Sequence, residues 1–324
     1  MTWVGWRQQR TETLIAAAVL ALLAALLVPT GLEMAHAFHR DGLSACLGQQ
    51  TSSSCDNAIQ SFGSRFHAIS NLTDWFTLLP GLIGVLLAAP FVLELESGTY
   101  RLAWTQSITR GRWIATKLGA ITGAALVAAI AMTLLITWWR SPLVRLNGRM
   151  DNSVFDFEGT VAIGYVLFAL GLALAVGVLW RRTVPALIIA FMGYIASRVF
   201  VDVWLRQRYE KPLTATWRDF IPGIGGHPHR GVEPTGISHA WVLSQYPSDK
   251  LGHPLRFLLA PCGPPTSHVG TVKCLAQNVA VYSHVVYQPA DRFWLFQGIE
   301  TAIFGGIALA LIGFAAWWTH RRTV

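Results

Sequence analysis

Six apolar runs, each about 20 residues long, constrain the fold of this 324-residue chain more than any other feature. A helix of about 20 apolar residues is long enough to cross a hydrocarbon core roughly 30 Å thick. A helix also satisfies its own backbone polar groups inside lipid. The pattern therefore predicts six transmembrane helices, over residues 13–32, 75–93, 114–139, 160–180, 184–205 and 293–318.

Composition agrees with a multi-pass membrane protein. Charged residues make up 13% of the chain, whereas a soluble domain carries about a quarter. Nine of the 14 tryptophans lie at or beside the ends of the apolar runs, where headgroup-level rings are expected. The net charge of +8 could indicate nucleic-acid binding. The lysines and arginines instead flank the apolar runs, so we expect a lipid bilayer and no nucleic acid as partner.

Basic residues indicate the orientation. With six spans, both termini lie on the same side of the membrane. If that side is the cytoplasm, the inner segments hold ten of the lysines and arginines in roughly 45 positions. The outer segments then hold 14 in roughly 155 positions. This density ratio predicts that the N and C termini are cytoplasmic.

The four cysteines fit the same orientation, because all of them fall in outer segments, where disulfides persist. Four cysteines allow three pairings. We favour the two local pairs, Cys46–Cys55 and Cys262–Cys274. Their spacing does not resemble a zinc ribbon, so zinc binding is the minor alternative.

The predicted fold is an all-α polytopic membrane protein with one small mixed α/β domain outside the membrane. That domain precedes the last helix, and "AWVLSQY" and "VAVYSHVVYQP" within it alternate like strands. The segments between spans are a cytoplasmic interfacial segment (1–12), extracytoplasmic loops (33–74 and 140–159), a cytoplasmic segment (94–113), the extracytoplasmic domain (206–292) and a cytoplasmic tail (319–324). The alternative reading of the first run is a cleaved signal peptide, but the run is long for one.

Few sequence motifs in this chain indicate catalysis, nucleotide binding or metal binding. The chain contains neither a phosphate-binding G-x-x-x-x-G-K-[ST] nor a nucleophile-elbow G-x-S-x-G. We therefore expect that the chain is not an ATPase by itself, and we assign no catalytic residues. "HPHR" at 227–230 could bind a metal, but it lacks a spaced carboxylate, so we expect no metal site.

Charged residues within the spans are costly and therefore informative. Arg198 and Asp202 lie four apart on one face of the fifth helix, and Glu300 lies at comparable depth in the last. These three could line a translocation path or form a structural ion pair between helices. A proton relay is a third possibility.

The stretch "ELESGTYRLAWTQSITRGRW" at 94–113 is the only substantial cytoplasmic segment between spans. It holds two carboxylates, three arginines and two tryptophans, more polar and aromatic chemistry than a plain connector needs. Thr109 can cap the helix that follows.

This stretch and its flanks, "FVLELESGTYRLAWTQSITRGRWIATKLGA", resemble a loop of the membrane subunits of type-2 ATP-binding-cassette (ABC) transporters. The shared pattern is Glu-x-x-x-Gly-Thr, then Thr-x-x-x-[ST]-Arg, then Lys-[LG], with Ser107 standing where the family often has Pro. The ending "YQPADRFWLFQGIETAIF" is similar to a subgroup common in high-GC Gram-positive bacteria.

The resemblance implies a homodimeric permease in the bacterial plasma membrane, docked on two copies of a separate ATP-binding subunit that holds ATP and Mg. The segment 94–113 would then be the coupling helix, and export of a hydrophobic drug, antibiotic or peptide the expected function. The residues that match the coupling motif are Glu94, Glu96, Gly98, Thr99, Arg101, Thr109 and Arg110.

Two rival interpretations stay open. A secondary transporter would be driven by protons through Arg198, Asp202 and Glu300. A membrane-anchored sensor or enzyme would use the 206–292 domain as its working part.

Overall fold

The computed structural model describes residues 2–46, 53–100, 109–150, 152–218, 220–221, 229–230, 237, 239–254 and 282–322. The chain forms two compact units. The first comprises Met1–Leu146, Ser153–Arg206 and Trp294–Val324, and it contains the long helices. The second comprises Asn147–Asn152 and Gln207–Phe293, and it contains the strands.

Six helices of the described residues are long and apolar enough to cross a bilayer, which confirms the predicted number. The sides of the membrane that their ends face stay a prediction. The spans are Ala17–Arg40, Leu79–Ser97, Arg110–Leu146, Val161–Trp180, Thr183–Arg208 and Ala290–Arg322.

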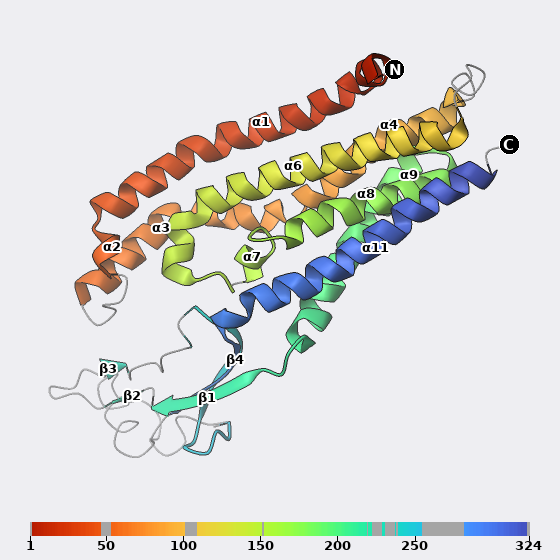
Figure 1. Cartoon of the computed structure of the whole chain (residues 1–324). Coiled ribbons are helices and arrows are strands. Elements are labelled where there is room, and N and C mark those ends of the chain that lie inside the picture. The colour runs from red at the N-terminus through yellow and green to blue at the C-terminus, as the bar shows by residue number, and fades with distance from the viewer. Residues whose placement is uncertain are drawn as a thin grey trace. The chain divides into compact units, whose positions relative to one another are not determined.

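The helices of the first unit are drawn in Figure 1. The long ones are α1 (Thr2–Arg40), α3 (Ser53–Phe76), α4 (Leu79–Ser97), α6 (Arg110–Asn147), α8 (Val161–Trp180), α9 (Thr183–Phe200) and α11 (Phe293–Arg322). The short ones are α2 (Leu43–Cys46) and α7 (Asn152–Phe155). A π-helical turn (Val201–Leu205) and a 3-10 turn (Arg206–Arg208) continue α9, and a second 3-10 turn (Ala290–Arg292) precedes α11.

Several helices are longer than the apolar stretches from which they are predicted. Helix α1 includes most of the interfacial segment expected at 1–12, and α6 runs on into the outer loop expected from 140. The outer loop expected at 33–74 is largely helical, because α3 occupies 53–76. Hydropathy marks where a helix contacts lipid, whereas the backbone hydrogen-bond ladder continues through polar residues.

Helix α8 is the central helix of the first unit, and it contacts both α4 and α9. Its small residues allow close approach of neighbouring backbones. A Cβ added at Gly84 of α4 would overlap the carbonyl oxygen of Val166, and one at Gly177 of α8 would overlap Val92. The core of the bundle therefore depends on glycines where α4 crosses α8.

A disulfide joins Cys46 at the end of α2 to Cys55 at the start of α3, with the Cα atoms 5.6 Å apart. This confirms the first predicted pair. An aromatic contact also joins α1 to α3, with the ring centroids of Phe38 and Phe62 6.2 Å apart. The pair Cys262–Cys274 lies outside the described residues and stays a prediction.

The second unit contains an antiparallel three-stranded sheet in the order β1 (Leu213–Arg218), β5 (Tyr282–Gln288) and β4 (Trp241–Ser248). Strands β4 and β5 are the two that the alternating stretches predict, and they pair with each other. The short strands β2 (Phe220–Ile221) and β3 (His229–Arg230) form a separate antiparallel pair. The last two residues of "HPHR" belong to β3, and the first two lie outside the described residues.

Candidate functional site

The end of α4 is shaped by the Gly98-Thr99 step. Helix α4 ends at Ser97, and Gly98 follows with φ 71°, a left-handed conformation that suits glycine after a helix. The hydroxyls of Ser97 and Thr99 lie 3.2 Å apart across this turn. The glycine at 98 is thus explained by the backbone conformation that ends α4.

Glu94 ties the end of α4 to the start of α6. Its Oε1 accepts a hydrogen bond from Lys117 Nζ at 2.5 Å, and both side chains are largely buried. One turn earlier on each helix, the Phe91 and Trp113 rings stack with centroids 5.9 Å apart. An ion pair and an aromatic contact therefore hold α4 and α6 together where the 94–113 segment begins and ends.

Glu96 ties the same end of α4 to α9. Its Oε2 accepts hydrogen bonds from the backbone nitrogen of Thr183 at 2.7 Å and from the Thr183 hydroxyl at 2.5 Å. Thr183 is the first residue of α9, where backbone N–H groups lack helical partners and a carboxylate is favourable. Glu96 therefore provides the acceptor for the N-terminal N–H group of α9.

Three further residues match the loop pattern of type-2 ABC transporters, and the structure describes two of them, Thr109 and Arg110. The carbonyl of Thr109 accepts a hydrogen bond from Trp113 at 3.1 Å, so Thr109 caps α6 through its backbone. Arg110 is the exposed first residue of α6. Arg101 lies outside the described residues.

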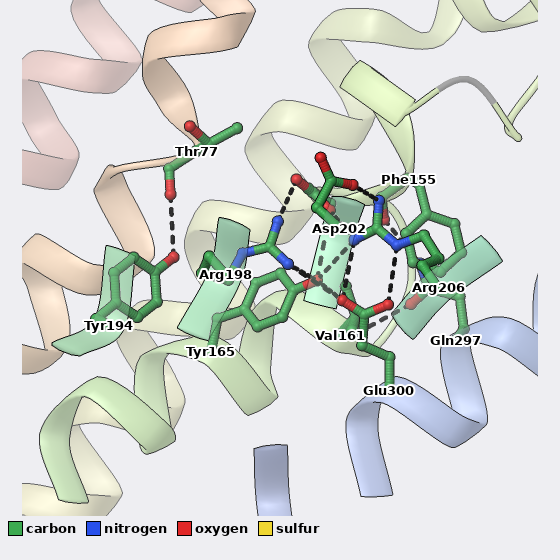
Figure 2. Close-up of polar contacts among 11 residues, drawn as sticks. Thr77, Phe155, Val161, Tyr165, Tyr194, Arg198, Asp202, Arg206, Gln297 and Glu300 are labelled. Atoms are coloured by element: carbon green, nitrogen blue, oxygen red, sulfur yellow. Dashed lines mark hydrogen bonds and ion pairs between the residues drawn. The ribbon is translucent and has the colours of Figure 1, made fainter. Parts of the chain in front are cut away.

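A buried charge network forms the second site (Figure 2). We name it the Arg198–Arg206 network, and it consists of Asp156, Tyr165, Arg198, Asp202, Arg206 and Glu300. It connects α9 and its π-helical extension with α8, α11 and the loop before α8. Its members lie close in space, although Tyr165 and Glu300 are 135 residues apart in sequence and Asp156 lies still further from Glu300.

The two guanidinium groups share their carboxylate partners. Arg198 Nη1 lies 3.1 Å from Glu300 Oε1, and Arg198 Nη2 is paired with Asp156. Arg206 Nη2 lies 2.9 Å from Glu300 Oε1 and 2.7 Å from Asp156 Oδ1. Each arginine thus contacts both buried acids, an arrangement that compensates the cost of taking charges out of water.

Tyr165 completes the centre of the network. Its hydroxyl accepts a hydrogen bond from Arg198 Nη1 at 2.6 Å and donates one to Glu300. The Arg198 guanidinium also lies over the Tyr165 ring, 3.8 Å from its centroid. Tyr165 therefore holds Arg198 by a hydrogen bond and by a cation–π contact.

The pKa of the Asp156 carboxyl depends on its two arginine neighbours. Burial alone would raise the pKa of this carboxyl, but the positive charges of Arg198 and Arg206 outweigh it and hold the pKa below its ordinary value. Asp156 is therefore ionised in the folded protein, although its side chain is almost completely buried.

The sequence identifies three of the network's members and misses three. The structure places Arg198, Asp202 and Glu300 in one network, with Asp202 paired to Arg206 at 2.8 Å. Whether they line a path, form a structural ion pair or relay protons stays a prediction. The spacing of Arg206, four residues after Asp202, is a signal that could have revealed it. Asp156 and Tyr165 carry no such signal, because only the tertiary structure brings the loop before α8 to α9.

A cavity of about 140 Å³ adjoins the network, at the break between α3 and α4. The hydroxyl of Tyr194 donates to the carbonyl of Thr77 in this break at 3.0 Å. The lining residues are Thr77, Leu78, Asp156, Tyr194, Ile195, Arg198, Val199 and Asp202. The cavity thus combines an apolar wall with charged members of the network.

Comparison with known proteins identifies the family. No curated protein and no solved structure matches the chain. A family model described as "ABC-2 membrane transporter related" matches residues 17–206, from the first membrane helix to the fifth and over more than half of the chain. The chain therefore belongs to the ABC-2 membrane transporter related family.

Proposed function

We propose that this chain is the permease subunit of an ATP-driven exporter, coupled through the 94–113 segment to a separate ATP-binding subunit. Membership of the ABC-2 family supports an ABC transporter permease. The sequence has no phosphate-binding G-x-x-x-x-G-K-[ST], so ATP and Mg would be bound by the partner subunit.

The observation that carries this proposal is the anchoring of the 94–113 segment to three spans. Glu94 joins α4 to α6 through Lys117, and Glu96 joins α4 to α9 through Thr183. A displacement of the segment would therefore move α4, α6 and α9 together. This is the connection needed for closure of ATP-binding subunits to shift spans between two packings.

The proposed assembly is a homodimer with two ATP-binding subunits in the bacterial plasma membrane. Its substrate would be a hydrophobic drug, antibiotic or peptide, moved outward. The termini would be cytoplasmic, and the unit containing β1, β4 and β5 would lie outside the cell, in line with the distribution of basic residues.

A proton-coupled secondary transporter is the second candidate, and the observation in its favour is the buried Arg198–Arg206 network. Ionisable groups inside membrane domains often mark proton or substrate pathways. In that case transport would need a proton gradient and no ATPase.

The deciding experiment is co-expression with an ATP-binding subunit encoded beside this gene, followed by co-purification and reconstitution in proteoliposomes. We expect a stable complex whose ATP-dependent transport is abolished by vanadate. Transport that proceeds without the ATP-binding subunit and collapses with the proton gradient would contradict the proposal and support the second candidate. Binding by the 206–292 domain alone would support the sensor.

A further inference from the structure

Four arginines gather at one end of the first unit, where α8 and α11 end. Arg181 and Arg182 follow Trp180, the last residue of α8, and Arg321 and Arg322 form the end of α11. We name these four residues the α8–α11 arginine cluster. Arg181 joins the two pairs, because its Nη2 donates a hydrogen bond to the carbonyl oxygen of Arg322 at 3.3 Å.

The packing of α8 against α11 brings the two pairs together. A Cβ added at Gly164 of α8 would lie 3.6 Å from the carbonyl oxygen of Thr301, and one added at Gly171 would lie 3.2 Å from that of Ala308. An equal step along α8 and along α11 separates these contacts, so the two helices run in the same direction and advance together. Continued to the end of α8, this register places the residues after Trp180 beside the last turn of α11.

Helix capping accounts for only part of the positive charge of the cluster. The C-terminal end of a helix carries about −0.5 of an elementary charge, so two such ends together balance roughly one arginine. Arg181 has that role, because it donates to the last carbonyl of α11. The charges of the other three arginines are left for another partner.

These three arginines form no salt bridge with a carboxylate of the described residues. Arg182 lies close enough to Glu96 for their charges to interact, but Glu96 Oε2 already accepts hydrogen bonds from Thr183. Arg182, Arg321 and Arg322 are all exposed. The cluster is therefore an accessible site with positive charge available for an anion.

Two tryptophans indicate the depth of the cluster in the membrane. The guanidinium carbon of Arg321 lies 5.5 Å from the ring centroid of Trp317, and that of Arg322 lies 4.8 Å from the ring centroid of Trp318. Tryptophan rings at the ends of spans lie at the level of the lipid head groups. The arginines that contact these rings therefore lie at head-group level as well.

Exposed apolar side chains adjoin the cluster along the chain. Leu179 and Trp180 at the end of α8 are 48% and 57% exposed, and Val184 at the start of α9 is 68% exposed. An exposed apolar surface beside charged residues marks a site for an apolar partner. The ligand that fits this surface combines a negatively charged head with a hydrocarbon tail.

We propose that the α8–α11 arginine cluster binds one anionic phospholipid. Its phosphate pairs with Arg182, Arg321 and Arg322, because guanidinium groups bind phosphate oxygens in a bidentate manner. Its acyl chains contact Leu179 and Trp180. The acidic surface of a protein partner would match the arginines but not these apolar side chains. The inference goes beyond the proposed function, and the binding needs neither ATP nor a partner subunit.

The test is native mass spectrometry of the full chain in detergent, titrated with dioleoyl-phosphatidylglycerol or with dioleoyl-phosphatidylcholine. We expect one phosphatidylglycerol to bind about tenfold more tightly than phosphatidylcholine, whose choline group brings a positive charge to the arginines. Inorganic phosphate at the same concentration should not displace the lipid, because it has no acyl chains. Equal affinity for the two lipids would overturn the proposal, and so would displacement by inorganic phosphate.

Variants locate the site. Arg321→Gln combined with Arg322→Gln removes two charges and should weaken phosphatidylglycerol binding about tenfold to thirtyfold. The corresponding double lysine variant keeps the charges but loses the bidentate geometry, so its affinity should be intermediate. The matched control is Arg40→Gln combined with Arg65→Gln, which removes two exposed arginines that already have carboxylate partners and should leave binding unchanged.

Thermal unfolding midpoints of all variants, measured without added lipid, should stay close to that of the parent, which separates loss of the lipid from loss of the fold. Equal phosphatidylglycerol binding by the parent and the double glutamine variant would overturn the proposal. A double glutamine variant that keeps the lipid but no longer co-purifies with the ATP-binding subunit would overturn it in favour of a protein-docking surface.

Discussion

Glu300 on α11 contacts the guanidinium of Arg206, 94 residues earlier, through both of its carboxylate oxygens. Oε1 lies 2.9 Å from Nη2, and Oε2 lies 3.0 Å from Nε. This bidentate contact is buried on both sides, with the Arg206 side chain 1% exposed and that of Glu300 0% exposed. It joins the last span to the extension of α9 and forms the centre of the Arg198–Arg206 network.

Replacement of Glu300 by Gln should destabilise the protein strongly. It leaves Arg198 and Arg206 with one buried counter-charge between them, and the loss of one partner from a buried ion pair costs roughly 3–5 kcal/mol of unfolding free energy. Thermal unfolding in detergent, followed by tryptophan fluorescence, measures the change. The matched control is Glu33→Gln, which breaks the exposed pair with Arg65 and should cost less than about 1 kcal/mol. Similar losses in the two variants would show that the network adds little stability.

Acid should weaken the bundle through Asp156. The folded-state pKa of this carboxyl lies below its unfolded value, so the unfolded chain binds the proton more readily. The stabilising contribution is therefore complete above the unfolded pKa of about 3.9 and is lost as the pH falls through the folded pKa. Unfolding midpoints measured from about pH 6 down to about pH 3 should fall, and the fall should be shallower in Asp156→Asn. An identical pH profile in that variant would contradict the assignment.

The crossing of α4 and α8 predicts an asymmetry between two glycines. Gly84→Ala places a methyl group against the backbone of α8 at Val166 and Leu170, which cannot move aside as a flexible side chain can. We expect a loss of about 1–3 kcal/mol in unfolding free energy. Gly298→Ala on α11 meets no atom within 4 Å and should leave stability unchanged or raise it slightly. A neutral Gly84→Ala would mean that the two helices can separate at this point without cost.

The Glu94–Lys117 pair provides a test of coupling. Glu94→Lys sets two ammonium groups together at the junction of α4 and α6, and it should lower transport-linked ATPase activity about fivefold or more while the protein still inserts. The double variant Glu94→Lys with Lys117→Glu restores an ion pair of opposite polarity and should recover most of that activity. Such recovery would be specific to the Glu94–Lys117 contact. A double variant as impaired as Glu94→Lys alone would contradict a role of this contact in coupling. Glu33→Lys serves as the control for a charge reversal elsewhere.

The Cys46–Cys55 disulfide allows the orientation of the membrane helices to be measured. In a background with Cys262 and Cys274 replaced by Ser, Cys46→Ser leaves a single thiol at Cys55. We expect a membrane-impermeant maleimide to label it in intact cells, because the predicted orientation places the α2–α3 connection on the outer side. A cysteine introduced at Ser97 should be labelled only after permeabilisation. The reverse labelling pattern would place the termini outside.

The disulfide should also stabilise the connection between α2 and α3. The cross-link closes a short loop, with the two cysteines nine positions apart. Its removal in the Cys46→Ser, Cys55→Ser double variant should cost about 2–3 kcal/mol of unfolding free energy. Comparison of thermal unfolding of parent and double variant, each without reductant, measures this cost.

The sequence by itself determined the number of spans and the strands β4 and β5, and it favoured the pairing of Cys46 with Cys55 that the structure shows. These features depend on local hydropathy, on two-residue periodicity and on short separation along the chain, all of which are visible without a structure. The sequence also singled out Arg198, Asp202 and Glu300, because charges in lipid-spanning helices are costly wherever they occur.

Only the tertiary structure decided which charges meet. Asp156 and Tyr165 join the network because α8, α9 and α11 lie side by side there, and no spacing in the sequence records that arrangement. The same holds for Glu96, whose acceptor role toward Thr183 depends on the end of α4 meeting the start of α9. The reason is physical: hydrophobic burial is non-directional and can be summed along a segment, whereas an ion pair requires two specific groups within a few ångströms.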